Sequence, residues 1–186
     1  MLNNICYKGD YMKTSKLLSL LGGLITLVAT FLFAWFVVDE SGTQYYGHGL
    51  GVFLSLPETF TNAETIALNW GVETFVIYIV GGTMIFFMFT WLLILLGIKN
   101  RILPIIGGLL TLALAIAIVV GPFSAPPNVL DYVSVFSSEA LGVFPFNIPI
   151  GPMGLTVGGS VSVSLGTYFL MGGGLLGVIS GFLPRD

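Results

Sequence analysis

The sequence predicts an all-α membrane four-helix bundle with a small, mostly β cap outside the cytoplasm. Hydrophobic side chains make up 55% of the 186 residues and charged ones only 8%. The mean hydropathy is +0.99, whereas about a quarter of the residues of an ordinary soluble domain are charged. Four uncharged segments are long enough to cross a hydrocarbon core of about 30 Å. These segments are residues 17–38, 74–98, 102–120 and 165–183, and we expect them to form a single integral membrane domain over residues 1–186.

The first segment, residues 17–38, is longer than the apolar core of a signal peptide, which has about 7 to 15 residues. No small-residue cleavage site follows it. We therefore expect this segment to be retained as a membrane span. The stretch "MKTSKLL" also reads as a natural start, so Met1 and Met12 are both candidates for the first residue.

The charged residues predict the orientation of the spans. All six basic residues fall before the first span, between the second and third, or after the fourth: Lys8, Lys13, Lys16, Lys99, Arg101 and Arg185. By the positive-inside rule, both termini are cytoplasmic and the long loops are extracytoplasmic. Seven of the nine acidic residues lie in these loops. We expect an integral protein of the cell membrane, and the acidic outer face disfavours nucleic acid as a partner.

The connections between the spans differ in length. The turn "GIKNR" at residues 97–101 allows only a tight helical hairpin. The outer loops, residues 39–73 and 121–164, far exceed what is needed to join two helices. The first mixes Tyr, Val and Phe with Gly and Pro, which predicts short strands followed by a helical turn near "NAETIALNW". The second is rich in proline and ends in the alternating "TVGGSVSVS", which predicts a strand leading into the last span.

A short sequence occurs twice. "LLGGLIT" at residues 20–26 returns as "IIGGLLT" at residues 105–111. "LGVF" occurs at residues 50–53 and 141–144, and a glycine pair occurs at residues 81–82 and 172–173. The order of these matches predicts a duplicated helix–loop–helix unit with parallel copies related by an axis near the membrane normal. Chance matching in a chain rich in Gly and Leu is the alternative.

Small residues spaced by four let helices approach closely in lipid, where apolar burial alone provides no driving force. The candidate helix-packing residues are Gly22, Gly23, Thr26, Gly81, Gly82, Gly107, Gly108, Thr111, Gly173, Gly177 and Gly181. The second span also carries bulky aromatic residues, and we expect them to face lipid or a partner: Phe86, Phe87 and Trp91. Trp35 and Trp70 lie at the predicted outer ends of the first two spans, where indole rings favour the interface.

The sequence contains no recognisable catalytic constellation. The four predicted spans hold no Asp, Glu, Lys, Arg or His, which argues against active transport. His48 is the only histidine and no cysteine lies on its side of the membrane, so we expect no metal and no cofactor. Here His48 would be a loop histidine exposed at a turn; the alternative is a metal ligand completed by carboxylates or another subunit. We also find no G-x-S-x-G elbow and no phosphate-binding loop.

The layout of four spans, a large first outer loop, a very short inner turn and a Gly-rich last span resembles the claudin-like tetraspan membrane proteins. Within the first loop, "GLGVF" at residues 49–53 and "LNW" at residues 68–70 are comparable with the family pattern. The two loop cysteines of that pattern are absent. The resemblance implies a role in adhesion or assembly and carries over no functional residue.

These observations favour a non-catalytic structural or accessory subunit of a membrane protein assembly, not an enzyme. Its expected partners are the lipid bilayer and either other membrane protein subunits or further copies of itself. One alternative is a channel or facilitator with a hydroxyl-lined path through the bundle or a homo-oligomer. Another is an enzyme that uses His48 and outer-loop acids with a borrowed metal. The scarcity of cysteine and of glycosylation sites suits a prokaryotic source.

Overall fold

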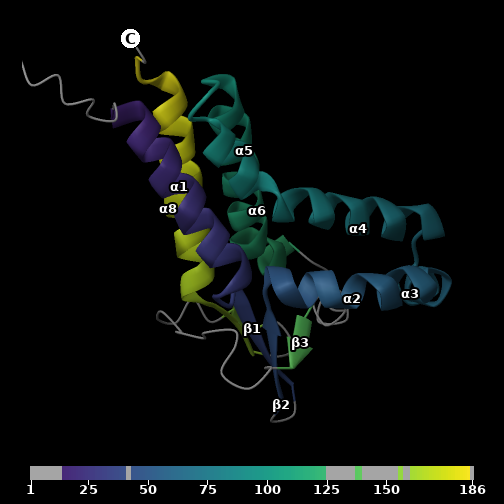
Figure 1. Cartoon of the computed structure of the whole chain (residues 1–186). Helices are drawn as coiled ribbons and strands as arrows, with labels where there is room; N and C mark the ends of the chain where they lie inside the picture. The colour runs from purple at the N-terminus through teal and green to yellow at the C-terminus, as the bar shows by residue number, and fades with distance from the viewer. Residues whose placement is uncertain (1–13, 41–42, 125–136, 140–154, 157–159, 185–186) are drawn as a thin grey trace, which may run out of the picture.

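The computed structural model describes residues 14–40, 43–124, 137–139, 155–156 and 160–184. Most of these residues are helical. The bundle consists of four helices that run along one another (Figure 1): α1 (Thr14–Phe31), α5 (Thr90–Leu96), α6 (Ile102–Ser124) and α8 (Leu165–Phe182). The arm consists of three helices that project sideways from it (Figure 1): α2 (Gly49–Thr61), α3 (Ala63–Trp70) and α4 (Thr74–Met88). A small sheet lies at the end of the bundle away from the C-terminus.

Four helical segments are long and apolar enough to cross a membrane: Thr14–Phe31, Thr74–Leu96, Ile102–Val120 and Leu165–Phe182. They correspond to the four segments predicted from hydropathy. The third and fourth begin at the predicted residues. In the third, the side chain of Asn100 accepts a hydrogen bond from the backbone N–H of Ile102 at 2.9 Å, which satisfies a free donor at the start of α6.

The first predicted span, residues 17–38, is too long at its outer end. Helix α1 ends at Phe31, and the chain continues into strand β1 (Phe36–Glu40). The backbone N–H of Trp35 donates to the carbonyl of Gly47 at 2.7 Å. The residues after Phe31 are mostly aromatic or β-branched, and such residues fit a pleated surface as well as a helix. The outer part of this segment therefore pairs in the sheet and is not part of the helix.

The second predicted span, residues 74–98, is not one continuous helix. Helices α4 and α5 meet at Phe89, whose φ of −100° and ψ of 3° are not helical. The Phe89 N–H donates to the carbonyl of Phe86 at 3.1 Å, and the Thr90 hydroxyl donates to Phe87 O at 2.8 Å. The first of these bonds closes a backbone turn tighter than that of an α-helix, and the second is a side-chain bond to the preceding turn. Only α5 stays in the bundle, and α4 leaves it to lie against α2 and α3 (Figure 1).

The two long loops contribute to one antiparallel sheet. Its strand order is β3-β2-β1-β5-β4, formed by β1, β2 (Thr43–Gly47), β3 (Ser137–Glu139), β4 (Leu155–Thr156) and β5 (Ser160–Val163). Strands β2 and β3 come from different loops and pair with each other, as do β1 and β5. The alternating stretch before the last span therefore forms a hairpin of two strands, β4 and β5, where one strand is predicted.

Among the described residues the cap is more helical than β, contrary to the prediction, because helices α2 and α3 take up most of the first loop. Their buried residues recur at helical spacing and include Val52, Leu56, Ala63 and Ala67, so one continuous face packs against α4. Gly71 ends α3 with a φ of 65°, a left-handed conformation that favours glycine. Most of the second loop, including the "LGVF" at residues 141–144, lies outside the described residues.

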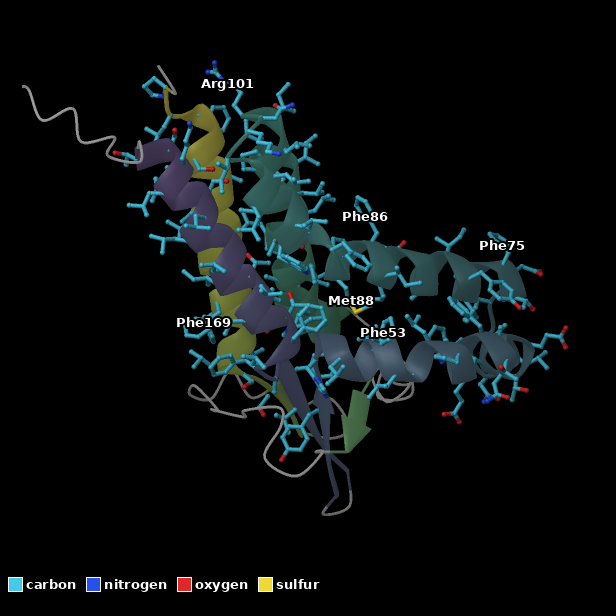
Figure 2. The ribbon with its side chains drawn as sticks, in the orientation of Figure 1. Phe53, Phe75, Phe86, Met88, Arg101 and Phe169 are labelled. Carbon is cyan, nitrogen blue, oxygen red and sulfur yellow. The ribbon has the colours of Figure 1, made fainter. Side chains whose placement is uncertain are left out.

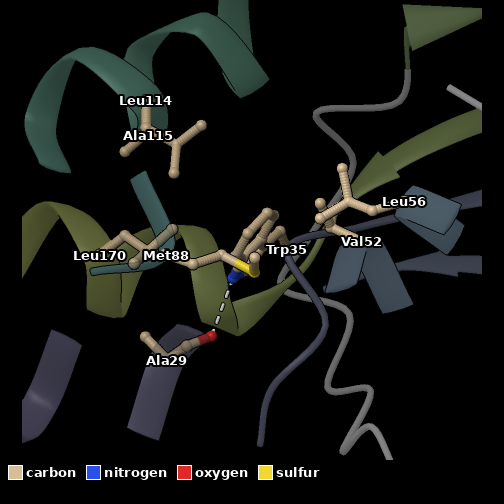
Figure 3. Close-up of a cluster of buried hydrophobic side chains, with 8 residues drawn as sticks. All are labelled: Ala29, Trp35, Val52, Leu56, Met88, Leu114, Ala115 and Leu170. Atoms are coloured by element: carbon tan, nitrogen blue, oxygen red, sulfur yellow. Dashed lines mark hydrogen bonds between the residues drawn. The ribbon is translucent and has the colours of Figure 1, made fainter. Parts of the chain in front are cut away.

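One core cluster joins the bundle, the arm and the start of the sheet (Figure 3). Its buried members are Ala29, Trp35, Val52, Leu56, Met88, Leu114, Ala115 and Leu170. The indole N–H of Trp35 donates to the carbonyl of Ala29 at 2.8 Å, and this side chain is only 3% exposed. Trp35 is therefore a core residue that fixes the base of the arm, and the prediction that it anchors at a membrane interface is wrong.

Candidate functional site: the glycine seam of the bundle

The glycine pair of α1 divides its contacts between two helices. A Cβ atom at Gly22 would lie 2.9 Å from the carbonyl oxygen of Gly173 and 3.1 Å from the N atom of Gly177, both on α8. A Cβ atom at Gly23 would lie 3.1 Å from the N atom of Leu95 on α5. Helix α1 therefore approaches α8 with one glycine and α5 with the next.

The glycine pair of α6 does the same in the opposite order. A Cβ atom at Gly107 would lie 2.9 Å from the carbonyl oxygen of Thr90 and 2.8 Å from Cβ of Leu93, both on α5. At Gly108 it would lie 2.5 Å from the carbonyl oxygen of Gly174 and 2.8 Å from the N atom of Val178, both on α8. Backbone meets backbone at these positions, so any side chain beyond hydrogen would separate the helices.

These contacts reveal an approximate two-fold relation within the bundle. Gly22 and Gly107 are 85 positions apart, as are Gly23 and Gly108. The atoms that they meet are related by 83 positions: Thr90 O corresponds to Gly173 O, Leu93 Cβ to Leu176 Cβ, and Leu95 N to Val178 N. Helix α1 thus relates to α8 as α6 relates to α5. The repeated "GG" motif is the part of each half that touches both neighbours.

This relation corrects the alignment of the sequence repeat. The sequence pairs Gly81 and Gly82 with Gly172 and Gly173, yet the first pair lies on α4 in the arm and the second on α8 in the bundle. Among the described residues, a Cβ atom at Gly82 would meet nothing within 4 Å. Gly82 is therefore not a helix-packing residue, contrary to the prediction.

The remaining predicted packing glycines lie against other elements. A Cβ atom added at Gly173 would lie 2.9 Å from Gly22 O. One added at Gly177 would lie 3.1 Å from Pro104 O, and one added at Gly181 would lie 2.7 Å from Arg101 O. At Gly81 it would lie 2.7 Å from Cζ of Phe60, inside the arm. These three glycines of α8 therefore pack against α1, against α6 and against the residue before α6, whereas Gly81 packs α4 against α2.

Most of the buried hydroxyl groups bond to the chain itself, whereas Ser15 Oγ has no hydrogen-bond partner among the described residues. Thr26 Oγ1 donates to Gly22 O at 2.8 Å, and Thr111 Oγ1 lies 2.8 Å from Gly107 O, so the two halves match here as well. Thr111 Oγ1 also lies 3.0 Å from Thr90 Oγ1 across the α5–α6 contact. Ser19 donates to the carbonyl of Ile94. The Ser19–Ile94 bond and the Thr90–Thr111 contact join two helices, whereas the bonds to Gly22 O and Gly107 O lie within one helix.

The predicted aromatic contact residues fall in different environments. Phe86 is 52% exposed on α4, whereas Phe87 is half-buried and packs against the core cluster. Trp91 is half-buried on α5, and its indole N–H finds no hydrogen-bond partner within the described part of the chain. Trp70 is half-buried and packs against the core cluster of Figure 3 and against a second cluster in the arm, formed by Ala63, Ala67 and Ile77. Phe86 alone among these residues presents most of its ring outward.

His48 is buried, with 1% of its surface exposed, and begins helix α2. Its Nδ1 accepts a hydrogen bond from the backbone N–H of Gly51 at 3.3 Å, so the imidazole acts as the N-cap. Burial lowers the pKa of His48 below its ordinary value of 6.5. The expectation of an exposed loop histidine is therefore wrong. Across the described ranges, no three His, Cys, Asp or Glu side chains lie close enough to hold a metal ion.

Comparisons with known protein families, with curated proteins and with solved structures found no match. The claudin-like resemblance remains a prediction. The stretches that carry it, residues 49–53 and 68–70, begin α2 and end α3.

Proposed function

We propose that this chain is a non-catalytic structural or accessory subunit of a membrane protein assembly. In this proposal α1, α6 and α8 cross the cell membrane, both termini are cytoplasmic, and the sheet and the α2–α3 layer lie outside. The observation that carries the proposal is the use of the glycines. Gly22, Gly23, Gly107 and Gly108 are all buried against helices of the same chain. They build a rigid bundle and leave partner contacts to the arm.

The outer face of α2 and α3 is the surface best suited to a protein partner. Leu68 is 82% exposed there, Glu64 is exposed one helical turn before it on α3, and Glu58 is exposed on α2. An apolar anchor surrounded by polar side chains is the usual anatomy of a protein interface. The core cluster fixes this surface to the bundle through Val52 and Leu56.

Gentle extraction from the native membrane, followed by sizing and mass spectrometry of co-migrating chains, tests the proposal. We expect the chain to migrate with other subunits or further copies, and we expect Leu68→Glu to release them. Lys99→Glu, an exposed charge change at the other end of the bundle, is the matched control and should leave the complex intact. A strictly monomeric particle without a partner would contradict the proposal, and ion or solute flux in liposomes would favour the channel alternative.

A further inference from the structure

The side of α4 that faces away from α2 and α3 is apolar and uncovered. Figure 2 shows Phe75 and Phe86 on this side. Phe75 is 60% exposed, Ile79 59% and Phe86 52%. Gly82 and Thr83, also exposed, lie between them, so the spacing follows one face of the helix. No charged residue occurs from Thr74 to Leu96.

The exposed acidic residues of the arm lie on α2, on α3 and at the N-cap of α4. The exposed polar residues of this part are Glu58, Thr61, Asn62, Glu64, Thr65, Asn69 and Glu73, and three apolar residues, Phe53, Leu54 and Leu68, are exposed among them. Residues 43–98 contain no Lys or Arg. The apolar side of α4 therefore carries none of the acidic groups of the arm, and residues 43–98 provide no Lys or Arg that anionic lipid headgroups would attract.

We infer that α4 lies flat in the outer leaflet of the bilayer, with its apolar face covered by lipid acyl chains and with α2 and α3 on its aqueous side. Two observations favour lipid over a second copy. This face continues at Phe89 into the exposed apolar surface of the bundle, which includes Leu92 on α5 and Leu109 on α6. In addition, α4 runs sideways from the bundle (Figure 1), so its whole length sits at one level. A helix in that position meets the same lipid belt as the bundle.

The proposal makes α4 an in-plane helix, whereas its hydropathy alone predicts a crossing helix. The two arrangements differ measurably. Phe75 and Phe86 are eleven positions apart, so a crossing helix places them at depths that differ by about 16 Å. A helix lying flat places them at nearly the same depth.

The experiment uses the full chain with Cys6→Ser and one cysteine at a time. Phe75→Cys, Ile79→Cys and Phe86→Cys are labelled with a bimane fluorophore and reconstituted in phosphatidylcholine vesicles. The acyl chains carry bromine near the headgroup in one set of vesicles and near the bilayer centre in the other. Glu64→Cys reports on the polar face, and Leu109→Cys reports on the bundle surface.

We expect the three α4 labels to lose fluorescence to the brominated lipids with the same ratio between the two bromine depths. The Glu64→Cys label should instead be quenched by aqueous iodide. A ratio that changes steadily from Phe75 to Phe86 would show a crossing helix and overturn the inference. Disulfide formation between copies at Ile79→Cys, without lipid quenching, would show that a second copy covers the face.

The Leu109→Cys label separates this inference from the premise on which it rests. Its quenching by lipid shows that the bundle is inserted, and its failure to quench would overturn the membrane placement as a whole. Because the purified chain is sufficient, the result does not depend on whether an assembly partner exists.

Discussion

Gly22 of α1 and Gly173 of α8 touch through their backbones, since a Cβ atom at either position would lie 2.9 Å from the other residue's carbonyl oxygen. At that distance neither helix has room for a methyl group unless the two move apart. The contact predicts opposite outcomes for alanine at buried and exposed glycines of this chain.

Gly22→Ala should destabilise the bundle by about 1–3 kcal/mol, the range for overpacking a filled contact. The matched control is Gly82→Ala, because a Cβ atom there meets nothing within 4 Å in the part of the chain that the structure describes. Removing a flexible glycine from an exposed helix position should stabilise the fold by about 0.5–1 kcal/mol. Thermal unfolding in detergent, followed by circular dichroism, measures both. Equal shifts of the unfolding temperature for the two variants would contradict a close backbone contact between Gly22 and Gly173.

The sequence predicts the helices better than the way they meet. Apolar runs locate α6 and α8 because their composition changes sharply at Ile102 and Leu165. The break at Phe89 is not predicted, because the residues on both sides of it are equally apolar. Hydropathy also gives no information on which neighbouring helix a segment contacts. Trp35 is misplaced for a related reason, because strand pairing with Gly47 pulls it into the core.

The sequence predicts part of the glycine contacts made by Gly22, Gly23, Gly107 and Gly108. The repeated "GG" motif identifies the small residues, and the spacing of four identifies a helix contact. Consecutive glycines contact different helices because α5 and α8 each pack against both α1 and α6. The sequence does not show this arrangement. The 83-position relation between α5 and α8 matches Leu92 and Leu93 with Leu175 and Leu176, but pairs of leucines recur too often in this chain for the match to reveal the relation.

Trp35 gives a second prediction. Trp35→Phe removes the indole N–H that bonds to Ala29 O and leaves a smaller ring in the core cluster. We expect a loss of about 1–3 kcal/mol, typical of a buried polar group that loses its partner. Trp70→Phe, at a half-buried position, should cost less. Chemical denaturation of both variants measures the loss in free energy of unfolding. A smaller loss for Trp35→Phe than for Trp70→Phe would contradict the core role of Trp35 and favour an interfacial anchor.

Thr90 and Thr111 give a third. Their hydroxyl oxygens lie 3.0 Å apart across α5 and α6, and such bonds between apolar helices are worth about 0.6 kcal/mol on average. A double-mutant cycle with Thr90→Val and Thr111→Val should show coupling of about that size. Thr26 has no bond to Thr90 in the described part of the chain, so the cycle pairing Thr26→Val with Thr90→Val should be additive. Coupling in the second cycle would mean that the valines shift the whole bundle.

His48 makes stability depend on pH. Its pKa is lowered in the folded state by burial, so the unfolded chain binds the proton more readily. The contribution of neutral His48 is fully present above the unfolded pKa of about 6.5 and is lost as the pH falls through the folded pKa. Protonation at Nδ1 also removes the acceptor for the Gly51 N–H and places a positive charge at the N-terminus of α2. His48→Asn keeps a capping acceptor without a titratable group, so its unfolding temperature should depend less on pH between 7.5 and 5. The unchanged pH dependence of that variant would show that another group is responsible.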